Sequence, residues 1–127
     1  MESSGKIEMP QYRYLELLDR GPVSRVQLKE EGSAYHAREV RALVAELNSV
    51  AEATDCRTLY IDCLNVKVLS SEMLSSLILL ERKLQQKEGK LILCGVRAEV
   101  REVLSWTKLD QVFEIQEGAE GEAATFA

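Results

Sequence analysis

Two adjacent serines, Ser70 and Ser71, stand where an apolar segment meets the start of an expected helix. A serine directly before a helix can accept a hydrogen bond from a backbone amide two or three residues further on. The free amides and the dipole at that end of a helix also favour negative charge. A phosphate on Ser71 would therefore be tolerated by the helix, while adding a charge of about −1.5 to −2 to its surface. We therefore expect one serine to cap the helix. Phosphorylation of Ser71 would block any partner that packs on this helix start.

Asp62 is a second candidate, because it ends an expected buried strand, and open α/β sheets bind their ligands at that end of the strands. Two interpretations of Asp62 stay open: a phosphoacceptor, as in receiver-like domains, or an aspartate that bonds the amides of the following loop. A phosphoacceptor aspartate needs Mg²⁺ held by further carboxylates. The next strand ends in Cys94 and Gly95 and offers none, which favours the loop-bonding role.

The remaining reactive residues do not assemble into a recognisable catalytic or metal site. His36 is the only histidine, so any catalytic triad or histidine metal site must use it, and Glu39 is its one potential partner on the same helix. The glycines form no phosphate-binding motif. Cys56, Cys63 and Cys94 are odd in number and form no C-x-x-C pair, so we expect them to be small buried apolar residues. We therefore predict no catalytic residue, no cofactor and no bound metal, and a protein that is not an enzyme.

The composition is that of one folded domain. The 127 residues are 46% hydrophobic and 29% charged, a balance that supports a packed core and differs from that of a disordered chain. The net charge of −5 argues against nucleic acid as the partner, because attraction to phosphates needs clustered Lys and Arg. No apolar run approaches the ~18–20 residues of a membrane span and no signal peptide opens the sequence, so we expect a cytoplasmic protein with reduced thiols.

The periodicity of the apolar residues predicts the elements that position these side chains. Strands are expected over residues 12–18, 23–29, 58–62, 90–96 and 112–115, and helices over residues 33–53, 71–87 and 98–108. The order β-β-α-β-α-β-α-β predicts an α/β fold with a mixed sheet, which is opened by an antiparallel hairpin and is otherwise largely parallel. Helices should pack on this sheet and leave one face less covered. Residues 11–116 would form the single domain, between a flexible N-terminal tail (1–10) and a flexible acidic C-terminal tail (117–127).

Several side chains have specific expected places in this fold. The first helix should begin after Ser33 as its N-cap, and Gly89 should follow the end of the second helix. Trp106 on the third helix is expected to lie in the core. The apolar stripes that would face the sheet are Ala37, Val40, Val44, Leu47 and Ala51 on the first helix, and Met73, Leu77, Leu80 and Leu84 on the second.

Residues 58–115 resemble the STAS domain, the family of anti-sigma factor antagonists and sulfate-transporter tails. The resemblance rests on an apolar strand that ends in aspartate (residues 59–62, LYID), followed by the segment NVKVLSSEML at residues 65–74. It continues with a second apolar strand and Gly-Val (residues 91–96, LILCGV), and with the family's spacing of apolar residues over residues 103–115. The expected opening hairpin and first helix agree with the family in their order.

The resemblance implies a bacterial regulator of transcription that works by partner switching. An unphosphorylated antagonist binds an anti-sigma factor that is also a serine kinase, and so releases a sigma factor. The kinase then phosphorylates a serine at the helix start, the complex dissociates, and a phosphatase resets the cycle. The phosphoacceptor position of the family falls on Ser71.

This sequence departs from the family pattern on both sides of Ser71. Ser70 replaces the aspartate that normally precedes the acceptor, and Glu72-Met73 replaces a small residue followed by glycine. Ser70 is therefore either a second candidate acceptor or the helix cap, and Glu72 adds a fixed negative charge that would repel a phosphate. We expect the partner-binding residues to be Ser70, Ser71, Glu72, Met73 and Ser75. The alternative function is a non-switching STAS subunit of a lipid-transport or signalling complex, and the sequence leaves the oligomeric state open.

Overall fold

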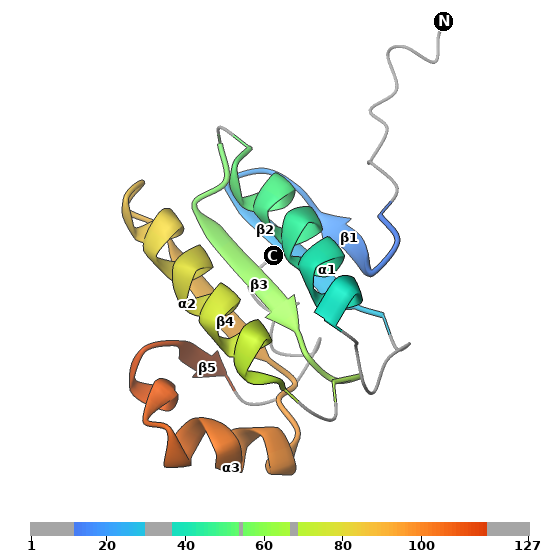
Figure 1. Cartoon of the computed structure of the whole chain (residues 1–127). Coiled ribbons are helices and arrows are strands. Elements are labelled where there is room, and N and C mark those ends of the chain that lie inside the picture. Colours follow the sequence, from blue (N-terminus) through green and yellow to red (C-terminus); the bar gives the residue numbers. More distant parts are fainter. Residues whose placement is uncertain (1–11, 30–36, 54, 67–68, 117–127) are drawn as a thin grey trace, which may run out of the picture.

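The computed structural model (Figure 1) describes residues 12–29, 37–53, 55–66 and 69–116. The two expected tails, the predicted N-cap Ser33 and the histidine His36 lie outside the described residues. The described part contains the serine pair, Asp62 and all three cysteines.

The strands and helices of the described residues follow one another in the predicted order. The strands are β1 (Leu15–Asp19), β2 (Val23–Leu28), β3 (Thr58–Asp62), β4 (Lys90–Cys94) and β5 (Glu114–Gln116). The helices are α1 (Ala37–Ala51), α2 (Ser71–Gln85) and α3 (Ala98–Trp106), with a short 3₁₀ turn, η1 (Leu109–Gln111), before β5. None of the described helices is both long and apolar enough to cross a membrane.

The five strands form one sheet in the order β1-β2-β3-β4-β5. β1 runs antiparallel to β2, and each of the other neighbouring pairs is parallel. This arrangement confirms the predicted mixed sheet. β5 begins two residues later than predicted, because the amides of Val112 and Phe113 both donate to the carbonyl of Leu109, at 2.9 and 3.0 Å, and so continue the η1 turn.

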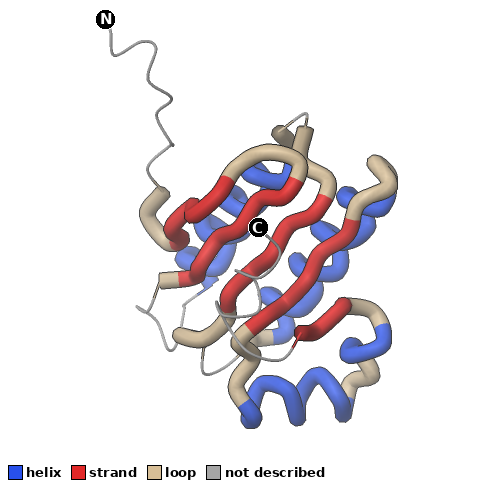
Figure 2. The backbone as a smooth tube through the Cα atoms, turned by 180° about the vertical axis from the view of Figure 1, so that it is seen from behind, coloured by secondary structure: helices blue, strands red, loops and turns tan. Residues whose placement is uncertain are grey.

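The two longer helices, α1 and α2, lie on one face of the sheet (Figure 1), and the other face carries no described helix (Figure 2). Successive residues of a strand point to opposite faces. In β3, Leu59 and Ile61 therefore belong to the main core under the helices, while Tyr60 belongs to a second, smaller buried cluster with Ile92 and Cys94 of β4. The predicted difference in coverage between the two faces is confirmed.

The buried face of α1 differs in part from the predicted stripe. Val40 and Leu47 are buried as predicted, but Val44 is only partly buried. Leu43 and Val50 occupy the core beside them. Ala51 is buried as predicted as well, and the side chain of Ala37 lies outside the described part of the chain. Because an α-helix turns by about 100° per residue, the five buried residues share one side of α1, and Val44 lies at its margin.

Trp106 was predicted in the core, and this prediction is wrong, since its side chain is 75% exposed. The residues of α3 that enter the core are Val100 and Leu104, which are four positions apart. Trp106 follows Leu104 by two positions, which places it about 200° around the helix from Leu104. α3 therefore turns its tryptophan away from the sheet.

Gly89 follows α2 as predicted, but for a different physical reason. The left-handed backbone conformation at the end of the helix belongs to Glu88, with φ of 63°. The amides of Glu88 and Gly89 donate to the carbonyls of Gln85 and Leu84, which is the hydrogen-bond pattern of a Schellman motif. A Cβ atom on Gly89 would overlap the carbonyl oxygen of Arg57. Glycine is needed here for the close approach of two backbones.

We predict that Gly89→Ala lowers the free energy of unfolding by about 2 kcal/mol or more, because the overlap with Arg57 forces the backbone to shift. Urea unfolding followed by circular dichroism measures the change. Glu88→Gly is the matched control, and it should not destabilise the protein because glycine tolerates a positive φ. A Gly89→Ala variant as stable as the wild type would contradict this account.

Candidate functional site

The carboxyl ends of the parallel strands β2, β3 and β4 meet at one edge of the sheet. The chain leaves β3 there to begin α2, and leaves β4 there to begin α3 (Figure 1). Open α/β sheets carry their functional loops at this edge. Asp62 ends β3 and the serine pair starts α2, so the two lie at opposite ends of the connection between these elements. The structure therefore brings them to the edge where a site is expected.

Asp62 serves the loop that follows it. Its carboxylate oxygen Oδ1 accepts a hydrogen bond from the amide of Leu64 at 2.9 Å, and Oδ2 accepts one from Nε2 of Gln27 at 3.2 Å. The side chain is buried at 5% exposure. The predicted loop-bonding role of Asp62 is confirmed. Within the described part of the chain, no group of three or more His, Cys, Asp or Glu residues could hold a metal ion.

Two further side chains hold the same loop from neighbouring elements. Nδ2 of Asn65 donates to the carbonyl of Leu28 at the end of β2, at 3.3 Å. Nη1 of Arg97, the residue directly before α3, donates to the carbonyl of Leu64 at 2.9 Å. The path from β3 towards α2 is therefore fixed by contacts to β2 and to the start of α3.

The three cysteines are buried and form no disulfide. Burial raises the pKa of the Cys63 thiol above its usual value, and the neighbouring Cys94 and Asp62 act in the same direction. A thiol that stays protonated is a poor nucleophile and a poor metal ligand. The prediction that the cysteines serve as small buried apolar residues is confirmed.

Ser70 and Ser71 have different roles at the start of α2. Ser70 is the N-cap, with an extended backbone, and its Oγ accepts a hydrogen bond from the amide of Met73 at 3.1 Å. Its carbonyl accepts the first helical bond, from Leu74, at 3.0 Å. Ser71 is the first residue of the helix and is exposed, and its hydroxyl makes no hydrogen bond to another described residue. The hydroxyl of Ser70 thus caps the helix, whereas the hydroxyl of Ser71 faces solvent.

Glu72 adds a negative charge beside Ser71, and the positive charge of a nearby arginine partly offsets it. Nη1 of Arg41 on α1 lies 4.0 Å from Oε2 of Glu72. Both side chains are well exposed, so the pair contributes little to stability. Its effect is local: the acidic group in the first turn of α2 faces one basic group of α1.

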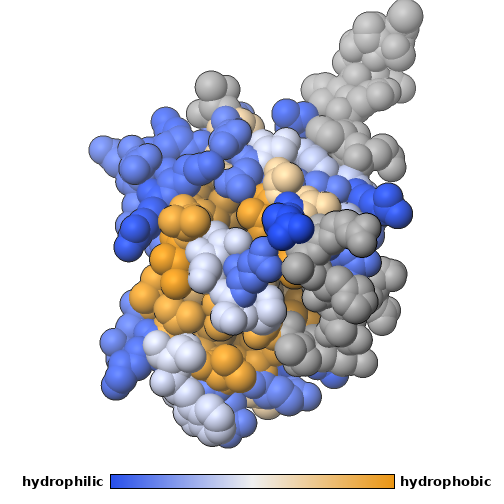
Figure 3. Space-filling view, in the orientation of Figure 1, coloured by the Kyte–Doolittle hydropathy of each residue, from blue (hydrophilic) through white to orange (hydrophobic). Residues whose placement is uncertain are grey.

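The solvent-facing side of α2 extends the site along the helix. Ser71, Ser75 and Leu79 follow one another at intervals of four, are all exposed, and form what we call the outer stripe of α2. Leu79 is 61% exposed, and Figure 3 shows apolar residues gathered over α2. Sequence reasoning missed Leu79, although its position off the stripe of Met73, Leu77, Leu80 and Leu84 could have identified it.

The predicted partner-binding residues do not all reach the surface. Ser70, Ser71, Glu72 and Ser75 are exposed. Met73 is buried at 4% exposure and packs in the main core. Its place among the partner-contacting residues is therefore corrected: Met73 supports the outer stripe from beneath. Leu64, on the loop after β3, is 42% exposed and adds a second apolar contact at this edge.

We predict that Ser70→Ala lowers the free energy of unfolding by about 1 kcal/mol, because the amide of Met73 loses its capping partner. Ser71→Ala should change it by less than about 0.5 kcal/mol, because its hydroxyl is exposed and makes no bond to a described residue. Chemical denaturation of both variants measures the difference. Equal destabilisation by the two substitutions would show that the capping role is not confined to Ser70.

Comparison with known proteins gives a family and a set of similar folds. The family model described as "STAS domain" matches residues 22–121. The structure is similar to that of an anti-sigma-factor antagonist (STAS) domain protein from Planctomyces limnophilus, with a TM-score of 0.76 and 19% identity over 86% of this chain and 93% of the other. No curated protein gives a significant match to the sequence.

Two structures of SpoIIAA show the same likeness of fold. The anti-sigma factor antagonist SpoIIAA in its unphosphorylated form has a TM-score of 0.72 and 18% identity over 87% of this chain and 92% of the other. The phosphorylated form of SpoIIAA, a Bacillus cell fate determinant, has a TM-score of 0.65 and 15% identity over 87% of this chain and 96% of the other.

Proposed function

Because this chain belongs to the STAS domain family, we propose that it acts as an anti-sigma factor antagonist in a partner-switching cycle that regulates bacterial transcription. The unphosphorylated chain binds an anti-sigma factor that is also a serine kinase. Phosphorylation of Ser71 ends this binding, and a phosphatase restores the serine. In this proposal the chain is the substrate of two enzymes and acts through binding alone.

The observation that carries the proposal is the division of tasks between the two serines. Phosphate on a capping hydroxyl would disturb the hydrogen bond that starts the helix, whereas phosphate on Ser71 leaves the bond from Met73 to Ser70 in place. The amides of the first turn and the helix dipole favour a negative charge at this position. Ser71 can therefore change its charge without unfolding α2, which is the property that a reversible switch needs.

The outer stripe of α2 supplies a surface on which such a charge would act. Ser71, Ser75 and Leu79 lie along one side of the helix, so a partner that covers Leu79 and Ser75 meets Ser71 as well. A phosphate beside Glu72 would concentrate negative charge at the edge of this contact. Desolvation of that charge would cost binding energy, and the complex would dissociate.

We predict that the cognate kinase with ATP adds a single phosphate to the chain, and that tandem mass spectrometry places it on Ser71. Ser71→Ala should abolish labelling. Ser70→Ala is the matched control and should still be labelled, because the outward hydroxyl of Ser71 is unchanged.

Phosphate on Ser70, or its absence from both serines, would contradict the proposed switch. A chain that stays unlabelled and co-purifies in a stable complex with a membrane transporter would support the alternative of a non-switching STAS subunit.

We also predict that Leu79→Ser weakens binding of the unphosphorylated chain to the kinase by about tenfold or more, because Leu79 is the large apolar side chain of the outer stripe and its exposed surface would be buried by the partner. Isothermal titration calorimetry measures the affinity. Val112→Ser is the matched control, since Val112 is also exposed, at 43%, and lies outside α2. If the two substitutions had equal effects on the affinity, the outer stripe would not be part of the binding surface.

A further inference from the structure

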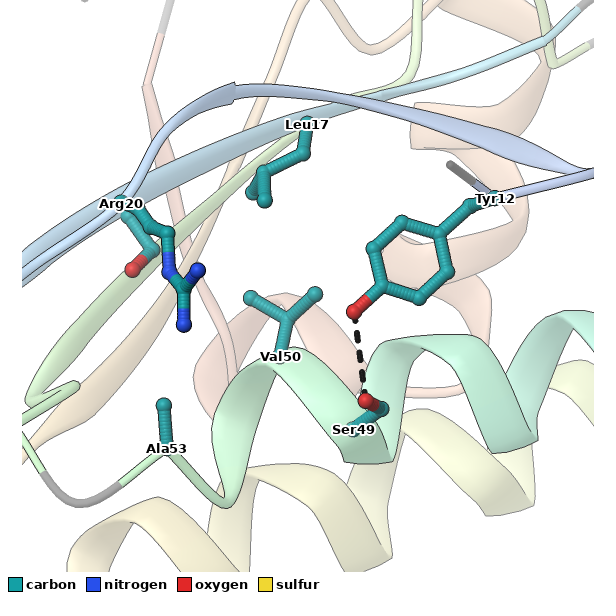
Figure 4. Close-up of a pocket in the computed structure, with 7 residues that line it drawn as sticks. Tyr12, Leu17, Arg20, Ser49, Val50 and Ala53 are labelled. Atoms are coloured by element: carbon teal, nitrogen blue, oxygen red, sulfur yellow. Dashed lines mark hydrogen bonds between the residues drawn. The ribbon is translucent and has the colours of Figure 1, made fainter. Parts of the chain in front are cut away.

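A small cavity lies at the other end of the sheet, between the hairpin of β1 and β2 and the last turns of α1. Its volume is about 100 Å³. Seven residues line it, and the six that Figure 4 labels are Tyr12, Leu17, Arg20, Ser49, Val50 and Ala53. None of its lining residues belongs to α2 or to the loop before it. The cavity is therefore separate from the proposed partner-binding surface.

The lining of the cavity is divided into an apolar and a polar part. Leu17, Val50 and Ala53 contribute aliphatic groups. The hydroxyls of Tyr12 and Ser49 lie 3.2 Å apart and share one hydrogen bond (Figure 4). Because each hydroxyl carries one proton and only one of the two is used in this bond, the other is free to donate to a ligand.

Arg20 brings a positive charge to the same cavity. Figure 4 shows its side chain reaching towards the cavity from the side opposite Tyr12. The carboxylate of Asp19, which directly precedes Arg20 in the chain, pairs with Arg25 at 3.1 Å. No ion pair joins Arg20 to another described residue. Arg20 is exposed, and an arginine at the mouth of a partly apolar cavity, with no acidic partner in the described part of the chain, favours an anionic ligand.

We propose that this cavity binds a small aliphatic monocarboxylate, of which isobutyrate is the test ligand. The carboxylate would accept hydrogen bonds from the Arg20 guanidinium and from the free hydroxyl proton of the Tyr12–Ser49 pair. The alkyl group would pack on Leu17, Val50 and Ala53. A cavity of about 100 Å³ is several times the ~10–15 Å³ that a single water molecule needs on the same measure, which leaves room for a short alkyl chain.

This ligand would be bound weakly, because so few atoms make contact. Ligand affinity is limited by the number of non-hydrogen atoms, and a molecule of this size is expected to have a Kd on the order of millimolar. The selectivity of the cavity for the acid would come from its charge. Isobutyramide, the neutral amide of the same shape, would pack in the same way but could not form the charge-assisted hydrogen bonds.

Titration of the ¹⁵N-labelled full chain with sodium isobutyrate, followed by NMR, tests the proposal. We expect saturable shifts of the amides in residues 17–24 and 49–53, and binding of isobutyramide that is weaker by about tenfold or more. Arg20→Gln should weaken isobutyrate binding by a similar factor. Arg82→Gln is the matched control and should leave it unchanged, since Arg82 is an exposed arginine on α2.

Ala53→Leu provides a second variant, which fills the cavity from its apolar side and should abolish the saturable shifts. Three results would overturn the proposal: no saturable shift in these two segments, equal affinity for the acid and the amide, or an affinity for isobutyrate that Arg20→Gln does not change. In every variant, the dispersion of the remaining NMR signals shows whether the protein is folded. A loss of binding can therefore be distinguished from a loss of structure.

Discussion

The hydrogen bond from the amide of Met73 to the hydroxyl of Ser70 is the interaction on which the functional surface depends. The first backbone amides of a helix have no partner within the helix, and the side-chain oxygen of the N-cap residue commonly accepts a hydrogen bond from one of them. Because Ser70 supplies that hydroxyl, α2 begins at Ser71, whose own hydroxyl stays outside the internal bonding of the helix. Two chemically identical side chains thereby acquire different roles, one in the fold and one on its surface.

The cap can do this only because α2 is held firmly against the sheet. Before α2, the residues that directly follow β3 are held by Asp62, Asn65 and Arg97. Further along, the buried carboxylate of Glu81 accepts the amide of Leu91 in β4 at 3.0 Å. A polar group that is buried must keep its hydrogen bonds, so this contact fixes the rotation of α2 as well as its position. The outer stripe faces solvent as a consequence.

The sequence allowed much of this fold to be predicted, because the order of elements and the role of Asp62 follow from local patterns of a few residues. The exposure of Trp106 did not follow, since it depends on the angle of α3 around its axis. The start of α2 at Ser71 was predicted, but the assignment of the cap to Ser70 required the observed hydrogen bond from the amide of Met73. The cavity beside Arg20 could not be foreseen, because it joins residues such as Tyr12 and Ser49, which lie 37 positions apart.

The central claim is that the charge on Ser71 controls partner binding. The most direct test is the affinity of the anti-sigma factor kinase for chains that carry phosphoserine at one chosen position. Phosphoserine at position 71 should weaken binding by about tenfold or more, while phosphoserine at Ser105, which is exposed on α3, should leave it close to that of the unmodified chain. An affinity that phosphoserine at position 71 does not change would contradict the account.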